Sequence, residues 1–368
     1  MSQVKLCFVA EAWGEHEEQL GRAMVGPTGI ELLKLCHEAQ IICLHREHWK
    51  LFSEFWNTRD GTYVDMVWAD FPELHRTNVI NQRPPNNKII AFCGGKKEGI
   101  SGFSAIVKGK FLLAHFRPEL DRLAEELDAL QPNLVVALGN TAMWALLGQT
   151  AISKNRGTTA ISSHTIAGFK VLPTYHPAAI FQQYKLRPVV CVDLEKARRE
   201  MEFPEIRRPA REIWIDPTLE DLEKFYDLHI RTCSILSVDI ETSGTLITCI
   251  GFAPSRDLAL VIPFFDPRAK GRSYWRDAGS EVTAKKFVKR VLEDPRIRKL
   301  FQNGMYDIAF IWRADGMKVM GATHDSMLAH HALQPESLKS LGFLGSVYTD
   351  SGAWKSLRED IETIKRDD

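Results

Sequence analysis

The stretch NLVVALGNTAMWALLG (133–148) decides the fold class of the first half of the chain. Its apolar beginning, NLVVALG (133–139), predicts a buried strand, and NTAMWALLG (140–148) predicts a helix directly after it. The same order recurs near the N-terminus, where VKLCFVAEA (4–12) precedes the helical spacing of TGIELLKLCHEAQI (28–41). Strands that alternate with helices predict a parallel α/β sheet, and the ligands of such sheets bind beyond the carboxyl ends of the strands.

Two further predicted strands of this half end in polar residues. RTNVINQRPPNN (76–87) indicates a strand stopped by two prolines, and FKVLPTYHP (169–177) indicates a strand followed by His176. That histidine is either a loop residue satisfied by its neighbours or a group held at a strand end for chemistry, and its position alone leaves both interpretations open. Residues 45–65, rich in Trp and Phe, and CGGKKEG (93–99) are expected to be loop insertions.

Length and composition indicate a globular protein of two domains. The chain has 368 residues, of which 45% are hydrophobic and 26% are charged. Lys plus Arg (47) equal Asp plus Glu (47), so a nucleic-acid surface, if present, must be a local patch. Seven cysteines without a C-x-x-C pair are typical of reduced thiols. With no signal-peptide pattern and no long apolar run, we expect a protein of the bacterial or phage-infected host cytoplasm without a membrane partner.

We expect domains at 1–203 and 218–368, joined by a proline- and arginine-rich linker at 204–217. In the second domain, SVDIETSG places Asp239 and Glu241 two residues apart on a predicted strand, so both side chains point to the same face. Adjacent carboxylates repel each other unless a divalent cation neutralises them. For this pattern alone, a solvated strand end is the commoner interpretation.

FQNGMYDIAFIW (301–312) adds Asn303 and Asp307, four residues apart where a strand enters a helix. The alternative interpretation is a capping asparagine with a surface aspartate. Taken with the carboxylate pair and with THDSMLAHHAL (323–333), the pattern resembles the 3′–5′ proofreading exonuclease domain of family A DNA polymerases, over about residues 212–350. The resemblance implies a ribonuclease H-like fold, a mixed sheet with flanking helices.

This resemblance also implies that Asp239, Glu241 and Asp307 bind two ions, Mg²⁺ or Mn²⁺, that activate water and steady the leaving oxygen at a 3′ terminus. The family completes its site with a Tyr-x-x-x-Asp motif, but here Tyr348 is followed four residues later by glycine. The charged, helix-like tail at 356–368 leads to no such motif. We therefore expect either a piece of a longer polymerase or an exonuclease with an incomplete site and weak activity.

The first domain resembles family 4 uracil-DNA glycosylases in four stretches that follow the family's order. These are AEAWGEHEEQLGRAMVGPTGIELL (10–33), TNVINQRPPNNK (77–88), QPNLVVALGNTAMWALLG (131–148) and VLPTYHPAAI (171–180). The resemblance spans about residues 4–200 and implies a three-layer α/β/α fold. It implies catalytic roles for Asn78 in reading the uracil edge, for His176 in donating to the developing uracil anion, and for Glu11 in orienting water.

The same resemblance implies a base pocket and a wedge. Ile180 and Phe181 occupy the place of an apolar wedge, although core packing after a turn is an equal alternative for both. The family's stacking phenylalanine is Met24 here, and its motif proline is Trp13, which either occludes the pocket or replaces the stacking partner. A cluster-ligating cysteine of the family is replaced by Gln82, so no iron–sulfur cluster is expected.

Together the two resemblances are to the N-terminal part of phage-type family A DNA polymerases. We expect a DNA replication or repair protein: a 3′–5′ exonuclease fused to a glycosylase-like domain that binds DNA. The alternatives are a non-catalytic DNA-binding platform and an inactive polymerase fragment. The expected partners are single-stranded DNA or 3′ ends, including uracil-containing DNA, and a downstream polymerase domain or replication proteins. The expected phosphate contacts, for which ordinary solvated surface is the alternative, are Arg83, Lys88, Lys96, Lys97, Lys108, Lys110, Arg156, Lys185 and Arg187.

Overall fold

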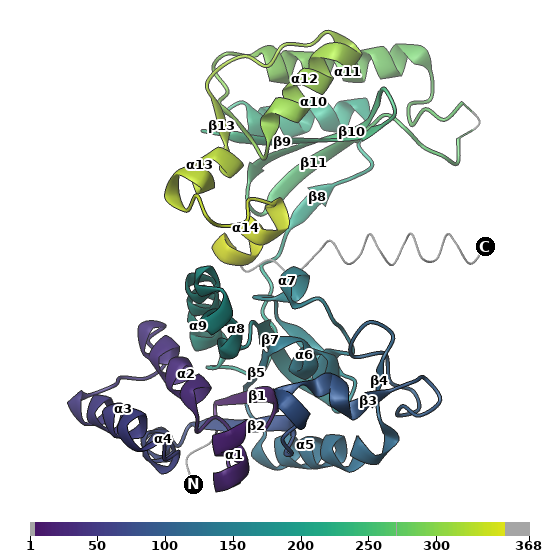
Figure 1. Ribbon diagram of the computed structural model, residues 1–368. Helices are drawn as coiled ribbons and strands as arrows, with labels where there is room; N and C mark the ends of the chain where they lie inside the picture. The colour runs from purple at the N-terminus through teal and green to yellow at the C-terminus, as the bar shows by residue number, and fades with distance from the viewer. Residues whose placement is uncertain (1–3, 270, 350–368) are drawn as a thin grey trace. The chain divides into compact units, whose positions relative to one another are not determined.

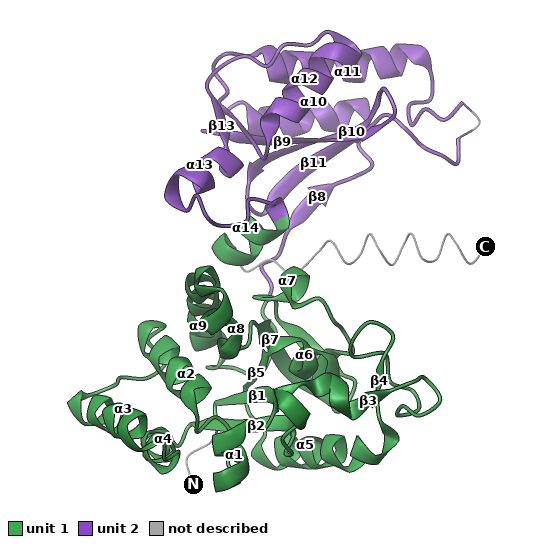
Figure 2. Ribbon diagram, viewed as in Figure 1, with its two compact units in different colours: residues 1–207, 342–368 green, residues 208–341 purple. Residues whose placement is uncertain are grey.

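A computed structural model of the protein describes residues 4–269 and 271–349 (Figure 1). The described residues divide into two compact units (Figure 2): residues 4–207 and 342–349 make unit 1, and residues 208–341 without 270 make unit 2. This division differs from the expected boundaries at the C-terminal side, because residues 342–349 bury Phe343 and Leu344 against Val189 of unit 1. The tail at 356–368 lies outside the described residues.

Unit 1 contains a five-stranded sheet in the order β2-β1-β5-β7-β6. The first four strands are parallel, and β6 is antiparallel to β7. The strands are β1 (Leu6–Ala12), β2 (Leu74–Ile80), β5 (Leu134–Leu138), β6 (Ala160–Ser163) and β7 (Ala167–Thr174). The helices are α1 (Glu15–Leu20), α2 (Pro27–Glu38), α3 (Arg46–Thr58), α4 (Thr62–Ala69), α5 (Arg117–Leu130), α6 (Gly139–Leu147), α7 (Ile152–Asn155), α8 (Pro177–Gln182), α9 (Arg187–Glu200) and α14 (Leu341–Tyr348).

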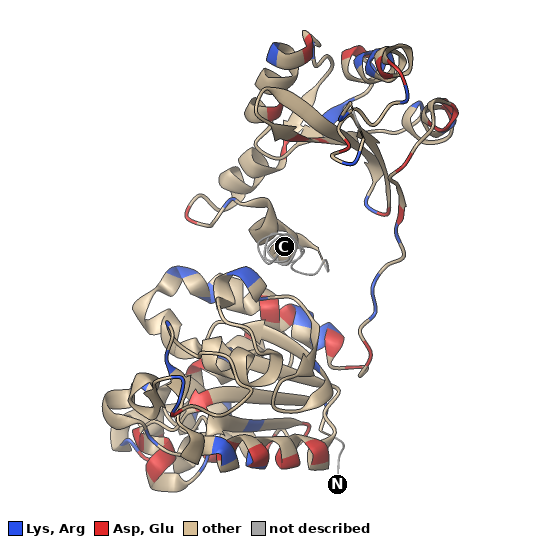
Figure 3. Cartoon of the chain, turned by 90° about the vertical axis from the view of Figure 1, so that its right-hand side faces the viewer, with Lys and Arg blue, Asp and Glu red and all other residues tan. Residues whose placement is uncertain are grey.

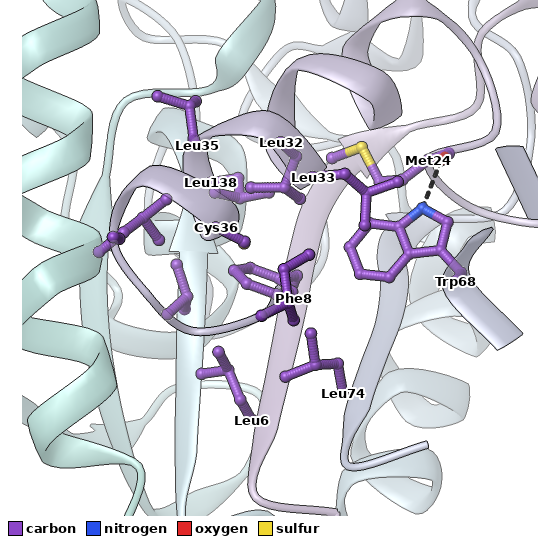
Figure 4. Close-up of a cluster of buried hydrophobic side chains, with 14 of the residues drawn as sticks. Leu6, Phe8, Met24, Leu32, Leu33, Leu35, Cys36, Trp68, Leu74 and Leu138 are labelled. Atoms are coloured by element: carbon purple, nitrogen blue, oxygen red, sulfur yellow. Dashed lines mark hydrogen bonds between the residues drawn. The ribbon is translucent and has the colours of Figure 1, made fainter. Parts of the chain in front are cut away.

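The core of unit 1 lies on both faces of this sheet. Side chains alternate along β1, so Leu6 and Phe8 join one buried cluster while Cys7 and Val9 join the other. Helices α2, α3, α4 and α9 contribute to the first cluster, part of which is drawn in Figure 4, and α5 and α6 contribute to the second. The arrangement is the three-layer α/β/α fold that the resemblance implied.

Two stretches expected to be loop insertions have regular structure. Residues 45–65 contain α3 and the start of α4, because Phe52 and Phe55 of α3 are buried in the core and stabilise the helix there. In the second stretch, β3 (Cys93–Gly94) pairs antiparallel with β4 (Phe111–Leu112) and forms a two-stranded ribbon. Short 3₁₀ helices occur at Pro85–Asn87, Ile89–Phe92, Ala114–Phe116 and Tyr184–Leu186.

Unit 2 contains a six-stranded mixed sheet in the order β13-β12-β9-β10-β11-β8, with one buried cluster formed with its flanking helices. Strands β9, β10 and β11 are antiparallel neighbours, while β12 is parallel to β9 and β13 is parallel to β12. The strands are β8 (Glu212–Trp214), β9 (Leu236–Ser243), β10 (Leu246–Ser255), β11 (Leu258–Pro263), β12 (Lys299–Phe301) and β13 (Thr323–Asp325). The helices are α10 (Leu219–Phe225), which continues as a π-turn over Tyr226–Ile230, α11 (Ala278–Glu293), α12 (Gly304–Asp315) and α13 (Ser326–Leu333).

The mixed sheet with flanking helices is the fold expected for the second domain. The expected linker at 204–217 is too long, because β8 lies inside it and pairs in parallel with β11 at the sheet edge. Among the residues that the structure describes, no helix combines the length and the apolar character needed to cross a membrane.

Candidate functional site

A cavity of about 440 Å³ lies at the carboxyl ends of the parallel strands of unit 1. Strand β1 contributes Glu11, β2 contributes Asn78, and the segment after β7 contributes His176. Neighbouring parallel strands end at the same edge of a sheet, which is why residues far apart in the sequence meet there. The three residues to which the resemblance assigns catalysis therefore line one cavity.

His176 is held in one protonation state by its backbone surroundings. It is the N-cap of α8, and its Nδ1 accepts a hydrogen bond from the Ala178 amide at 3.2 Å. Burial lowers the pKa of His176 to about 4, so the ring is neutral near pH 7 and carries its proton on Nε2. Gly139 makes room for the ring: its φ is +88°, and a Cβ there would lie 3.2 Å from the Cβ of His176.

Asn78 has a buried amide group with an unmet hydrogen bond. The residue is 2% exposed, and within the described residues its Nδ2 has no hydrogen-bond partner. Leaving a buried donor unsatisfied costs about 1–3 kcal/mol, which makes this group a candidate for ligand binding. Its main-chain oxygen accepts a 2.6 Å hydrogen bond from Arg122 of α5, which also forms ion pairs with Glu119 and Glu126. Arg122 was not among the predicted site residues, although glutamates three residues before it and four after it indicate an arginine held by ion pairs.

Two glutamates stand in the wall of the cavity. Burial raises the pKa of Glu11, and a hydrogen bond from the Thr141 hydroxyl acts in the opposite direction. Glu17 was not anticipated. Its carboxylate accepts hydrogen bonds from the amides of Gly14, Val25 and Gly26 at 3.2, 3.0 and 2.9 Å, so it ties together the two loops that carry Trp13 and Met24.

Trp13 and Met24 both line the cavity, and neither fills it. The backbone of Met24 has a φ of +55°, and its carbonyl accepts a 3.0 Å hydrogen bond from the Trp68 indole (Figure 4). Gly29 is required beside it, because a Cβ there would lie 1.8 Å from the Met24 oxygen. The Met24 side chain is 3% exposed and packs in the core cluster.

The two expected wedge residues have different environments. Ile180 is 2% exposed and belongs to the core, so the packing alternative describes it. Phe181 is 59% exposed on α8, and Tyr184 just beyond the helix is 74% exposed. Of the expected pair, only Phe181 is available to a partner, and Tyr184 is a second exposed aromatic ring that the sequence analysis did not single out.

The expected phosphate contacts also divide into two groups. The expected phosphate contact of Arg156 is wrong. Its side chain is 1% exposed and its guanidinium pairs with the buried carboxylate of Asp193, so it is not a surface cation. Arg83 pairs with Glu15 and Glu18. Arg187 pairs with glutamates of α2. In contrast, the stretch 88–111, which contains β3 and reaches β4, has five exposed lysines and one acidic residue, Glu98. Figure 3 shows the chain with its basic and acidic residues coloured.

In unit 2 the structure brings the expected carboxylates near one another. Asp239 and Glu241 project from the face of β9 opposite the buried Val238 and Ile240. Asp307, in the first turn of α12, is 5% exposed. Burial and then the charge of Asp239 raise the pKa of Asp307 to about 6, and burial and then the charge of Glu241 raise the pKa of Asp239. These shifts indicate a concentration of negative charge that a cation would relieve.

Asp325 and Tyr306 frame this cluster. The Asp325 carboxylate accepts hydrogen bonds from the amides of Asn303 (3.2 Å) and Gly304 (2.8 Å), and it also caps α13. Burial acts to raise the pKa of Asp325, but the hydrogen bonds from these amides hold that pKa below its usual value. Asp325 thus joins the first turn of α12 to the end of β13. The Tyr306 hydroxyl lies 3.0 Å from the Thr242 hydroxyl, next to Glu241.

The donor sets favour a hard cation in unit 2 and do not fit an iron–sulfur cluster in unit 1. Oxygen ligands from Asp239, Glu241 and Asp307 suit Mg²⁺ or Mn²⁺, although within residues 4–269 and 271–349 no three His, Cys, Asp or Glu side chains are already gathered for a metal. In unit 1 the buried Cys7 and Cys36 belong to opposite core clusters. Gln82, at the position of a cluster ligand, lies instead 3.5 Å from Glu119.

Comparisons with known proteins find two consecutive family matches along the chain. Residues 1–200 match the family model described as the uracil DNA glycosylase superfamily, and residues 218–356 match the model described as 3′–5′ exonuclease. A type-4 uracil-DNA glycosylase of Thermotoga maritima is 27% identical over 198 residues, which cover 53% of this chain and 76% of that protein. A DNA polymerase of Bacillus phage SP01 is 22% identical over 241 residues, 58% of this chain but 25% of the polymerase.

Among solved structures, the RNase D of Trypanosoma brucei in complex with RNA U12 is similar at a TM-score of 0.27 and 18% identity. The similarity covers 34% of this chain and 40% of that one. The chain therefore spans less than half of this structural relative and about a quarter of the phage polymerase.

Proposed function

This chain belongs to the uracil DNA glycosylase superfamily, and from that premise we propose that unit 1 binds a uracil base extruded from DNA and cleaves its glycosidic bond. The observation that carries the proposal is the buried Nδ2 of Asn78, which has no hydrogen-bond partner among the described residues and lies in one cavity with a neutral His176. A cavity of about 440 Å³ suits a small ligand of this size.

Each polar group has a role in this reaction. The Asn78 amide donates to O4 of uracil and accepts from N3–H. Cytosine presents the reverse pattern, a donor at N4 and an acceptor at N3, so it leaves an amide in this orientation unsatisfied. As the C1′–N1 bond breaks, its electron pair leaves with the base, and His176 Nε2–H donates to the developing anion at O2. Water, oriented by the Glu11 carboxylate, bonds to C1′, and the proton that it loses passes through solvent to the departing uracil anion, so the products are an abasic sugar and neutral uracil.

Release of uracil from a labelled oligonucleotide tests the proposal. The assay is run in EDTA, so that metal-dependent cleavage by unit 2 is silent, and abasic sites are revealed with alkali. We expect His176→Ala to lower the single-turnover rate about 10²–10³-fold, because it removes one donor to the developing anion. His115→Ala, an exposed histidine of unit 1, is the matched control and should be unchanged. Absence of alkali-labile sites, with uracil-dependent binding retained, would instead support the non-catalytic platform.

A second candidate function is 3′-terminal phosphodiester hydrolysis in unit 2. It is favoured by the raised pKa values of Asp239 and Asp307. Burial is the first cause for both, followed by the charge of Glu241 for Asp239 and the charge of Asp239 for Asp307. These three side chains would hold Mg²⁺ or Mn²⁺, which when bound supplies charge neutralisation and an activated water. Asp325 would hold the first turn of α12, and with it Asp307, beside β9 through the amides of Asn303 and Gly304. Tyr306 would limit the access of DNA beside Glu241.

DNA is the partner that both functions require. We place its phosphate contacts on the five exposed lysines of the stretch 88–111, because within the described residues none of them forms an ion pair. This stretch begins beside Pro84 and Asn87, which line the cavity, so a strand held by the lysines would pass the mouth of the base site. Phe181 is the exposed apolar residue available to fill the gap left by an extruded base.

A further inference from the structure

The segment 342–349, which follows unit 2 in the sequence, is built into unit 1. Its apolar side chains Phe343 and Leu344 are 8% and 6% exposed and pack against Val189 of α9. Tyr175, the residue before His176, packs against the same small cluster and also lines the cavity. The segment therefore touches the back of the wall that carries His176.

A buried charged network binds the same segment. Arg156 pairs with Asp193 of α9 and donates its remaining Nη1 to the Ser346 hydroxyl at 2.8 Å. Asp193 in turn accepts a 2.6 Å hydrogen bond from the hydroxyl of Thr174, the last residue of β7. The chain of contacts Ser346–Arg156–Asp193–Thr174 thus ends two residues before His176.

Lys196 of α9 is a second anchor for this segment. It is 5% exposed, and its ammonium donates to the carbonyls of Gly157, Ser346 and Thr349, the last at 2.6 Å. Two of these three acceptors belong to the segment 342–349. A buried ammonium that loses hydrogen-bond acceptors is costly, so the two acceptors on this segment stabilise its docked position on unit 1.

The point where the chain leaves unit 1 is held in the same way. Lys170 of β7 is 1% exposed and donates to the carbonyls of Glu200, Phe203 and Glu205, at 2.7, 2.6 and 3.1 Å. Both passages of the chain, out of unit 1 and back into it, are therefore bound by a buried lysine through main-chain oxygens.

We propose that the segment 342–349 is a docking segment that completes the glycosylase-like unit and positions the His176 end of β7. Docking satisfies Arg156 and Lys196 and packs Phe343 behind Tyr175; undocking leaves both cations partly unmet and loosens that wall. The segment acts through Tyr175 and Thr174 and is a positioning element. This role rests on the proposed base-release function only for its catalytic consequence, because the docking itself is a property of the fold.

Hydrogen exchange on the full chain tests the docking. We expect Phe343→Ala to raise amide exchange in peptides covering 187–200 and 171–176 by at least about tenfold, because removal of a buried aromatic ring lowers the free energy of local opening. Leu338→Ala, at a position 60% exposed and five residues earlier, is the matched control and should leave both peptides unchanged. Ser346→Ala removes the hydroxyl that accepts from Arg156 and donates to the Phe343 carbonyl, and it keeps the aromatic ring. It serves where Phe343→Ala fails to fold, and a smaller rise confined to the same peptides is expected.

The two proposals fail in different ways. Where the parent protein releases uracil, we expect Phe343→Ala to lower kcat with little change in KM for DNA, and Phe343→Leu to restore most of it. Where the parent releases no uracil, the base-release proposal fails while the exchange result still decides docking. The docking proposal is overturned, whatever the activity, if Phe343→Ala raises amide exchange in 187–200 and 171–176 no more than the Leu338→Ala control does.

Discussion

At the scale of single residues, His176 shows how the backbone sets side-chain chemistry. The Ala178 amide occupies Nδ1, and burial holds the pKa of the ring at about 4, so the group that faces the cavity is a neutral Nε2–H donor. Because of its low pKa the ring stays neutral near pH 7. A neutral imidazole can still stabilise an anion by donating its N–H. Because the proposed reaction creates negative charge on the base, this protonation state suits a donor that works near pH 7.

The low pKa of His176 also predicts a pH dependence of stability. Its folded-state pKa, about 4, is below the ordinary value of 6.5, so between these values the unfolded chain binds a proton that the folded chain does not. Stability from this residue is therefore complete above pH 6.5 and is lost as the pH falls towards 4. From pH 7.5 to 5 the loss is at most about 2 kcal/mol.

Urea unfolding of the parent protein and of His176→Gln, at pH 7.5, 6 and 5, measures this contribution. Glutamine does not titrate, so the stability difference between the two proteins should shift in favour of the variant as the pH falls. A difference that stays constant over this range would mean that the His176 ring is solvated in the folded protein.

Residue identity alone placed some of these groups well and others wrongly. Glu11 and Asn78 lie near the carboxyl ends of predicted strands and His176 follows one, and the ends of parallel strands meet in space by topology. Arg156 was assigned to the DNA surface because its partner, Asp193, is 37 residues away and on another element. A cation looks the same in the sequence whether its carboxylate is beside it or absent.

At the scale of elements, local signals located strands and helices but not their partners. The apolar runs at 133–139 and 169–174 became central strands, as expected. Residues 212–214 were assigned to a linker because three residues are too few to show the hydrophobic alternation of a strand. Only their pairing with β11 makes them a strand. Residues 45–65 were assigned to a loop, whereas burial of Phe52 and Phe55 against the sheet makes them helical.

The lysine-rich stretch 88–111 makes a prediction at this scale. If it binds phosphates, Lys96→Ala/Lys97→Ala should flatten the plot of log binding constant against log salt concentration, by about 0.9 per lost contact on duplex DNA and about 0.7 on single strands. Fluorescence anisotropy between low and moderate salt measures the slope. The control is Lys50→Ala/Lys286→Ala, which removes equal charge from exposed positions outside the stretch. Equal slopes for the two double variants would place the DNA contact elsewhere.

At the scale of the whole molecule, the order of units along the sequence is simpler than the order in the fold. Two consecutive domains were expected, and the two family matches are indeed consecutive, at 1–200 and 218–356. The compact units are interleaved, because residues 342–349 return to unit 1. Nothing in that short stretch distinguishes a helix of unit 2 from one docked on α9; the distinction depends on Arg156 and Lys196, which lie far away in the sequence.

The last prediction is that the two proposed activities separate by metal dependence. The cavity of unit 1 uses Asn78, Glu11 and His176, whereas the cluster of unit 2 has a cation's usual carboxylate ligands. We expect EDTA to abolish shortening of a 3′-labelled single strand and to leave uracil release unchanged. Asp239→Ala should remove only the shortening, and His176→Ala should remove only the release.

The expected shortening is slow, because the Asp325 carboxylate is engaged by backbone amides and the described residues hold no gathered set of three metal ligands. Two ions require more negative charge than Asp239, Glu241 and Asp307 supply. Asp227→Ala, an exposed aspartate of unit 2 whose side chain is 61% exposed, is the matched control for Asp239→Ala. Loss of uracil release in Asp239→Ala would contradict the assignment, because one site would then serve both reactions. Shortening that survives EDTA would also contradict it, because the cleavage would not depend on a metal ion.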